Sequence, residues 1–304
     1  MGGGSAARQH ERRFRQGEPT WSEVKEEACS FDEMPEMVKA FREYEVYKAK
    51  DSGYELVKEG VVVGSFSDAR VEKNRVVFLL SHGTLLEVSE KGRREILTPE
   101  KAELCGLIAS DGGNHFYWRF NRKTGTYHPV YRTSLDSKDK ELIDRFDSLF
   151  KEVYNAAPHH YPQRDGKMRT MASNKGIFYD LQDVGAKTGP FKFHVPIEHL
   201  DEEGLRAYLR GFFSGDGNVS RQGAGRIAIR IYSSCGECLG EVRQAFIDLG
   251  FHPHEIHRRV KPRWNPEHSF SIPAREHIRF IEEIGSKNPE HIRKFQEMRR
   301  VKSR

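Results

Sequence analysis

The stretch LCGLIASDG at residues 104–112 returns in register as LRGFFSGDG at residues 209–217. Each copy reads as an apolar helix with a small residue inside it, and each ends in Asp-Gly. The two aspartates, Asp111 and Asp216, stand 105 residues apart. A duplication of this kind predicts two similar halves whose helices pack together, so that each half brings one carboxylate to a shared point.

Two glycines, Gly106 and Gly211, occupy the same register of the two copies. A glycine inside a helix costs roughly 1 kcal/mol relative to alanine, so the matched pair predicts a close approach of two helices. The last carbonyls of a helix are unpaired, and its dipole is negative there. Together with Asp111 and Asp216, these carbonyls would form an oxygen-rich, anionic site suited to Mg²⁺. A single Asp-Gly would be only a helix cap and a turn.

Length and composition bound the class of protein. The chain has 304 residues, enough for two or three domains and a sizeable core. Its four cysteines are too few for a disulfide framework and suit a reducing compartment. Because the sequence opens without the apolar segment of a secretory signal and has no long apolar run, we expect a cytoplasmic protein with no membrane partner. The net charge of +5 combines many charges of both signs, so its local distribution is more informative.

The N-terminal part shows no catalytic motif. Residues 1–18 are rich in Gly and Arg and are interpreted as a disordered basic arm. Residues 19–97 form an N-terminal α/β extension. Apolar residues at helical spacing predict a helix over residues 20–50, and short β-branched runs predict strands over residues 54–89.

Residues 98–200 and 201–304 are predicted as two repeats with the order α-β-β-α-β-β-α. The first motif helix should begin after Thr98, an N-cap residue followed by proline. After this helix, Gly112 can adopt a positive φ. Alternation then predicts a half-buried strand, with its inner face formed by Phe116, Trp118 and Phe120.

Both motif stretches resemble the LAGLIDADG motif of homing endonucleases, and their spacing is similar to that of the monomeric, two-repeat archaeal and intein-type members. The resemblance covers residues 98–304. It implies an α+β fold in which antiparallel sheets of two pseudo-symmetric repeats form a DNA-binding saddle, with the motif helices at the interface between the halves. Ala109 stands where the namesake motif has its first Asp, a position that varies within the family.

The resemblance also implies a metal site and an activity. The acidic residues at the eighth motif position, here Asp111 and Asp216, would bind Mg²⁺ together with the carbonyls of Ser110 and Gly215. Mn²⁺ or Ca²⁺ could substitute for binding. A monomer would cut both strands of a long, pseudo-palindromic DNA site across the minor groove and leave 3′ overhangs.

The family often adds a basic residue in each half. Lys287 is our choice in the second half and Lys192 in the first, where Lys187 and His194 remain alternatives. Each lysine could instead be an ordinary solvated or phosphate-binding residue.

Polar and basic side chains share one face of several predicted strands. Such faces can lie in the major groove, although a solvated outer sheet face has the same pattern. The candidate DNA contacts of the first repeat are His115, Tyr117, Arg119, Asn121, Arg164, Lys167 and Arg169. Those of the second repeat are Arg226, Arg230, His257, Arg259, Lys261 and Arg263.

One further motif has no place in this scheme. Cys235 and Cys238 form a single Cys-x-x-Cys without the second pair that is usual in structural zinc sites. A zinc site with nearby histidines is conceivable, but ordinary thiols at a helix start are the preferred interpretation.

Three functional hypotheses remain. The first is a monomeric, metal-dependent DNA endonuclease encoded in an intron. The second is an RNA-binding intron maturase, and the third is a cleavage-inactive DNA-binding regulator on the same fold. The presence of both Asp111 and Asp216 argues against the third hypothesis and does not exclude the second.

Overall fold

The computed structural model describes residues 37–41, 43–49, 53–187, 192–221, 227–260 and 265–302, with side chains up to residue 298. These residues form two compact units. One comprises the described residues up to Leu80 together with Leu86–Arg94, and the other comprises Ser81–Leu85 and the described residues from Glu95 onward. The division lies near residue 97, where the sequence separates the extension from the repeats.

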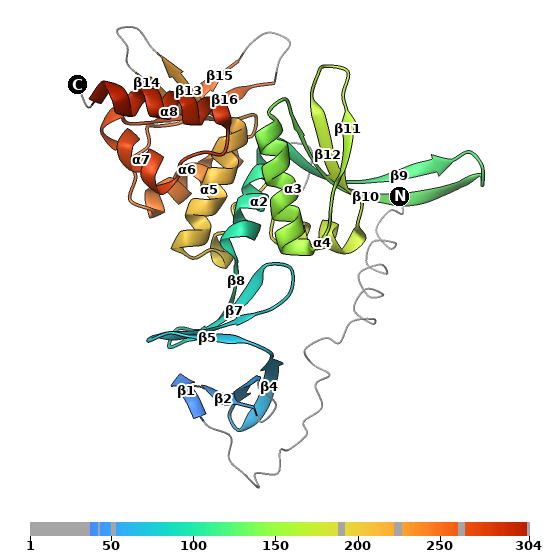
Figure 1. The fold of residues 1–304 in the computed structure, drawn as a ribbon, viewed down its shortest axis with the longest axis vertical. Coiled ribbons are helices and arrows are strands. Elements are labelled where there is room, and N and C mark those ends of the chain that lie inside the picture. Colours follow the sequence, from blue (N-terminus) through green and yellow to red (C-terminus); the bar gives the residue numbers. More distant parts are fainter. Residues whose placement is uncertain are drawn as a thin grey trace, which may run out of the picture. The chain divides into compact units, whose positions relative to one another are not determined.

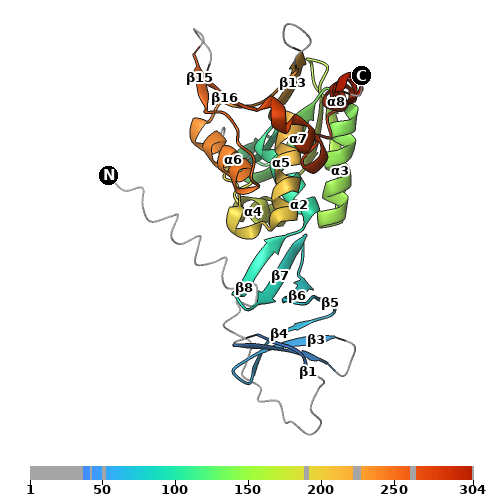
Figure 2. The ribbon, with the colours of Figure 1, turned by 90° about the vertical axis from the view of Figure 1, so that its left-hand side faces the viewer.

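The N-terminal part forms two four-stranded sheets, with the strand orders β1-β2-β3-β4 and β5-β6-β7-β8 (Figure 2). The strands are β1 (Met37–Phe41), β2 (Tyr44–Lys48), β3 (Tyr54–Lys58), β4 (Val61–Phe66), β5 (Ala69–Val71), β6 (Arg75–Leu79), β7 (Thr84–Ser89) and β8 (Gly92–Leu97). Side chains from both sheets make one apolar cluster: Phe41, Val46, Leu56, Val76, Phe78, Leu86 and Val88.

The prediction of a helix over residues 20–50 is wrong for its described part, which forms β1 and β2. The apolar spacing of Met37, Val38 and Phe41 fits a helix. However, Phe41 and Val46 are both buried from adjacent strands of a hairpin, and β-branched and aromatic residues suit such a half-buried pleated surface. Residues 20–36 and the arm at 1–18 lie outside the described residues.

The second unit contains two repeats of the same topology, which confirms the predicted α+β fold with antiparallel sheets. The first repeat contains α2 (Pro99–Ala109), β9 (Gly112–Asn121), β10 (Thr126–Ser137), α3 (Lys140–Tyr154), β11 (His159–Pro162), β12 (Met168–Ala172) and α4 (Lys175–Asp183). The second contains α5 (Glu202–Asp216), β13 (Gly217–Arg221), β14 (Ile227–Ser233), α6 (Gly236–Asp248), β15 (His257–Arg259), β16 (Glu267–Ile272) and α7 (His277–Glu283). The sheet orders β9-β10-β12-β11 and β13-β14-β16-β15 are equivalent.

The motif helices α2 and α5 lie side by side at the centre of this unit (Figure 1). A Cβ atom on Gly106 would lie 2.1 Å from the carbonyl oxygen of Tyr208, and one on Gly211 would lie 2.2 Å from that of Glu103. The two helices therefore touch backbone to backbone, as the matched glycines predict. Around them lies a single apolar core that includes residues of both repeats, such as Leu107 and Phe212.

The first motif helix begins as predicted, because the Thr98 hydroxyl accepts a hydrogen bond from the backbone N–H of Lys101 at 3.3 Å. The prediction of a positive φ at Gly112 is wrong. Gly112 is the first residue of β9, where a Cβ atom would lie 2.6 Å from the Cα atom of Ile108 and 3.0 Å from the Ser134 carbonyl oxygen. Glycine is required here by close packing between helix and sheet.

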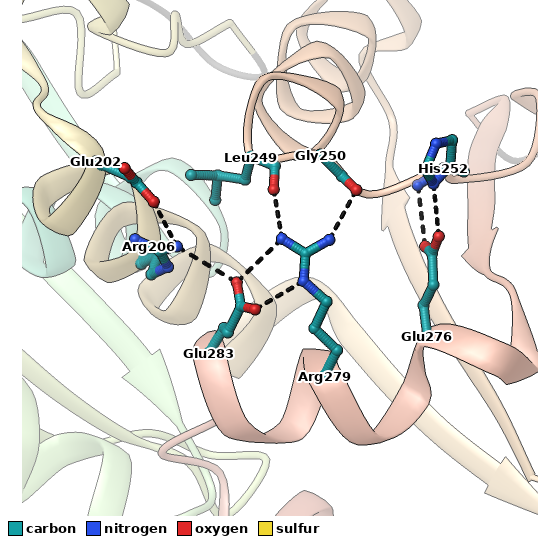
Figure 3. Close-up of polar contacts among 8 residues, drawn as sticks. All are labelled: Glu202, Arg206, Leu249, Gly250, His252, Glu276, Arg279 and Glu283. Carbon is teal, nitrogen blue, oxygen red and sulfur yellow. Dashed lines mark hydrogen bonds and ion pairs between the residues drawn. The ribbon is translucent and has the colours of Figure 1, made fainter.

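Helix α7 holds α5 and α6 together through charged side chains (Figure 3). Arg279 donates to the carbonyls of Leu249 and Gly250 at 2.6 and 2.7 Å, which caps the C-terminal end of α6. The same guanidinium pairs with Glu283, which also meets Arg206 of α5 at 3.4 Å. These contacts connect α7 to both α5 and α6.

Two features of the second unit differ from the sequence analysis. A C-terminal helix, α8 (Pro289–Lys302), was not predicted, although His291, Phe295 and Met298 are buried at helical spacing. The disulfide between Cys235 and Cys238 overturns the interpretation of these residues as ordinary thiols. Cys235 is the N-cap of α6, so the first turn brings the two Cα atoms to 5.4 Å, within the range that a disulfide spans.

Among the described residues, no helix is long and apolar enough to cross a membrane.

The helix contact can be tested with two glycine substitutions. Gly211→Ala should destabilise the protein by about 2 kcal/mol or more, because the added Cβ atom cannot be accommodated without separating the helix backbones. Gly240→Ala in α6 is the matched control, since nothing lies within 4 Å of its Cβ position. The control should stabilise the protein by about 0.5–1 kcal/mol. Chemical denaturation of both variants checks this, and a neutral Gly211→Ala would contradict the contact.

Candidate active site

The C-terminal ends of the two motif helices meet. Ser110 caps α2, and Gly215 lies in the last turn of α5. A Cβ atom on Gly215 would lie 2.3 Å from the Ser110 hydroxyl oxygen and 3.2 Å from the Asp111 nitrogen. The structure therefore brings Asp111 and Asp216, which directly follow these contact points, to one place.

The surroundings of these two carboxyl groups disfavour their ionised forms. Burial raises the pKa of Asp216 to about 7, and repulsion from Asp111 contributes in the same direction. Burial likewise raises the pKa of Asp111, against the attraction of Lys167 and Lys187. Asp216 is half-buried and the Asp111 residue is exposed, yet the surrounding protein still displaces enough water to disfavour both charged forms.

Lys187 is the basic residue that interacts with both carboxylates. Its ammonium group donates to the carbonyl oxygens of Ser110 and Gly112 at 3.3 and 2.8 Å. Burial lowers the pKa of Lys187, while attraction to Asp216 and Asp111 opposes this shift. One lysine therefore fastens the turn that carries Asp111 and provides positive charge to both carboxylates.

The other predicted basic residues lie elsewhere. Lys192 is exposed, and His194 pairs with Glu241 of α6 at 2.9 Å. The structure thus favours Lys187 over Lys192 and His194 in the first half. Lys287 is half-buried in a loop whose backbone N–H donates to the Ser214 hydroxyl at 2.8 Å. This loop is fastened two residues before Asp216, so Lys287 stays the prediction for the second half.

The residues present fit a divalent cation that keeps several of its waters. Within the described ranges, no group of three or more His, Cys, Asp or Glu side chains could hold a metal. An ion here would take two carboxylates, from Asp111 and Asp216, together with the carbonyls of Ser110 and Gly215 and water. Mg²⁺ commonly binds with few carboxylates and several waters. A cation would relieve the repulsion from Asp111 that adds to the effect of burial on the pKa of Asp216.

The predicted polar face of the first sheet begins at this site. His115 lies opposite Arg132 on β10, and burial lowers the pKa of His115, with Arg132 as a further cause. Arg132 has an Nε atom that is buried without a hydrogen-bond partner among the described residues, although its guanidinium lies 5.6 Å from the Tyr117 ring. Arg119 is exposed farther along the same face. Arg132 was missed because the alternation of residues 128–135 is ambiguous.

At the opposite edge of this sheet the predicted contacts include one engaged residue. Arg169 pairs with Asp136 through two hydrogen bonds of 2.6 Å, so part of its charge is already neutralised. Arg164 is exposed, and Lys167 lies 4.0 Å from Asp165 in the turn of the β11–β12 hairpin. This hairpin turns at Asp165 and Gly166 as predicted.

In the second sheet, alternation separates the faces as predicted. Ile229 and Ile231 are buried, whereas Arg230 is exposed opposite Asn218 and Ser271. His257 and Arg259 of β15 are exposed on the same face. Asn218, Tyr232, Ser269 and Ser271 also lie on this face, and they could not be predicted from charge because they carry none. Three predicted contacts lie outside the described residues: Arg226, Lys261 and Arg263.

Comparison with known proteins identifies the second repeat. Residues 203–285 match the family model of the LAGLIDADG-like domain, and this stretch contains Asp216. The resemblance predicted from the sequence is therefore confirmed for this repeat.

Similar solved structures include the homing endonuclease I-DmoI in complex with DNA and Mn, at 20% identity over 62% of this chain and 96% of that chain, with a TM-score of 0.47. The meganuclease I-SmaMI bound to uncleavable DNA is 14% identical over 64% of this chain and 86% of that chain, with a TM-score of 0.43. At these scores the likeness carries no further conclusion.

Curated relatives match only parts of their own length. The probable cell division protein WhiA of Pediococcus pentosaceus is 27% identical over 225 residues, which are 71% of this chain and 65% of that protein. The serine-protein kinase RsbW of Bacillus cereus is 36% identical over 45 residues, which are 15% of this chain and 28% of that protein. The chain thus spans between about a quarter and two thirds of these relatives.

The crowded carboxylates predict a pH effect on the metal-free protein. Because the folded pKa of Asp216 is about 7 and the ordinary value is near 4, ionisation of Asp216 should destabilise the fold as the pH rises between these values. In EDTA, Asp216→Asn should therefore be more stable than the wild type at pH 8 and differ little at pH 4. Melting temperatures measure this, with Asp165→Asn in an exposed turn as the control. An unchanged difference between the two pH values would refute the assignment.

Proposed function

We propose that this chain is a site-specific endonuclease of double-stranded DNA that depends on a divalent metal, of the homing endonuclease kind. The observation that carries the proposal is the pair of carboxylates, Asp111 and Asp216, at the abutting ends of two equivalent helices. The LAGLIDADG-like match of residues 203–285 and the two equivalent sheets support it.

In this proposal each part of the site has one task. Asp111 and Asp216, with the carbonyls of Ser110 and Gly215, hold the cations, with Mg²⁺ as the physiological ion and Mn²⁺ or Ca²⁺ as substitutes for binding. When bound, a divalent metal would supply a lowered water pKa and positive charge to offset the charge that develops on the phosphodiester. Lys187 keeps the Ser110–Gly112 turn in place and adds positive charge beside it.

The pseudo-symmetry supports the finer features of the reaction. Each repeat would supply one carboxylate for one strand of the duplex. The two sheets would contact the two halves of a long, pseudo-palindromic site. We propose a monomer that cuts across the minor groove and leaves 3′ overhangs, because both halves of the site are present within one chain.

A second candidate is a cleavage-inactive DNA-binding regulator. The match to WhiA covers 71% of this chain, and that relative is named a probable cell division protein and not a nuclease. The intact pair of carboxylates and the lysine beside it favour the nuclease. A third candidate, an RNA-binding maturase on the same fold, would be distinguished from both by binding RNA instead of DNA.

Substitution of the carboxylates tests the proposed reaction. Duplex DNA selected by the wild-type protein from a random pool should be cut in Mg²⁺, and Asp111→Asn or Asp216→Asn should abolish the cut while binding persists in Ca²⁺. Gel assays measure both steps. Binding without cleavage by the wild type would favour the regulator, and selective binding of RNA would favour the maturase. Full cleavage by either variant would exclude the assigned site.

A pair of lysine variants tests the residue assignment in the first half. Lys187→Met should lower the cleavage rate at least about tenfold, since its charge and both carbonyl contacts are lost. Lys192→Met, five residues away and exposed, should cleave at nearly the wild-type rate. Single-turnover kinetics on the same selected duplex measure this. The reverse order of the two rates would restore Lys192 as the functional residue.

A further inference from the structure

The two ribbons that lead away from the site differ in length. Counted in register from Gly112 and Gly217, Phe116 pairs with Tyr131 in the first ribbon, as Arg221 pairs with Ile227 in the second. Beyond these pairs the first ribbon continues through residues 117–130, which are fourteen residues, whereas the second has only residues 222–226, which are five. The first ribbon thus carries an extension that the second repeat does without.

The extension contributes little to the fold. It projects past the helices of its repeat (Figure 1), and the buried core includes none of its residues. Trp118, Phe120 and Tyr127 are 60%, 48% and 67% exposed, so the predicted half-buried strand is wrong here. The second repeat builds the same sheet order without such an extension, so these exposed residues call for a role outside the core.

The charge of the extension has one sign. Residues 112–135 contain no Asp or Glu, in a chain that has 45 of them, and they carry Arg119, Arg122, Lys123 and Arg132. Arg119 lies opposite His128 on the face that continues inward to the pair of His115 and Arg132. This face therefore carries basic residues both beside the candidate active site and toward the ribbon tip, with Tyr117 and Val130 paired between them.

Aromatic rings on the other face stiffen the ribbon. The rings of Phe120 and Tyr127 lie 5.0 Å apart across the strands, and those of Phe116 and Tyr131 lie 5.1 Å apart. Tyr131 then contacts Phe178 of α4 at 5.4 Å. Cross-strand aromatic pairs each stabilise a ribbon by up to about 1 kcal/mol. These pairs therefore stabilise the paired strands of the ribbon and connect its base to α4.

We propose that the extended ribbon binds duplex DNA flanking the core site on one side only, so that recognition is longer at one end of the target. The proposal rests on the proposed DNA-binding function. Nine extra residues add between four and five per strand, or about 15 Å at roughly 3.4 Å per residue. This length corresponds to about four base pairs at 3.4 Å each, and the major groove admits a two-stranded ribbon.

Selection from a pool of duplexes with a long random segment tests this directly. The wild-type protein should recover sequences whose specified positions extend about four base pairs farther at one end. A variant in which Asn-Gly replaces residues 118–129, and so joins Tyr117 to Val130 in a tight turn, should lose those positions and keep the rest. A second variant with Arg119→Ala, Arg122→Ala and Lys123→Ala keeps the backbone and should lose affinity and salt dependence.

Lys151→Ala on the exposed side of α3 is the control for charge alone and should bind like the wild type. Positions specified to equal length at both ends, or an unchanged motif in the shortened variant, would overturn the inference while leaving the nuclease intact. Asymmetric binding without cleavage would support the ribbon and contradict the nuclease. If the wild type selects no duplex at all, the proposed function and the inference both fail.

Discussion

The backbone contact between α2 and α5 determines the geometry of the second unit. At Gly106 and Gly211 no side chain separates the helices, so the carbonyls of Tyr208 and Glu103 occupy the space that a Cβ atom would need. This contact continues to the helix ends, where Gly215 lies against Ser110. The same packing that brings the halves together therefore forces two carboxylates into a poorly solvated place, and the site is a consequence of the helix contact.

A buried carboxylate with partners in both repeats restricts their relative orientation. Glu103 of α2 is 1% exposed, and its carboxylate accepts two hydrogen bonds from Arg145 of its own repeat and one, at 3.3 Å, from Arg210 of the other. A buried charge is tolerated only when it is well paired, and it adds more to the choice of arrangement than to stability. A rotation of one repeat against the other would leave Glu103 incompletely paired. This pairing therefore helps to define how α2 and α5 are aligned.

The sequence predicts those features that depend on local pattern or on repetition. The motif helices, their close approach and the alternation around Ile229 and Ile231 follow from spacing alone. Lys187 could not be chosen over Lys192 because that choice depends on the path of the chain after α4, which no periodicity describes. Alternation also does not reveal whether other elements cover a strand. Trp118 has the alternation of an inner-face residue, but it is exposed because the ribbon extends past the helices of its repeat (Figure 1).

The pseudo-symmetry is broken at the site itself. Helix α5 continues through Asp216, whereas α2 ends at Ala109 and leaves Asp111 in a turn. Lys187 donates to the carbonyl of Gly112 in that turn, and burial raises the pKa of Asp216 to about 7. The two carboxylates therefore differ in backbone conformation and in neighbours, although the helices before them are equivalent. In the proposed nuclease, the two strands of a duplex would then meet chemically different halves of one site.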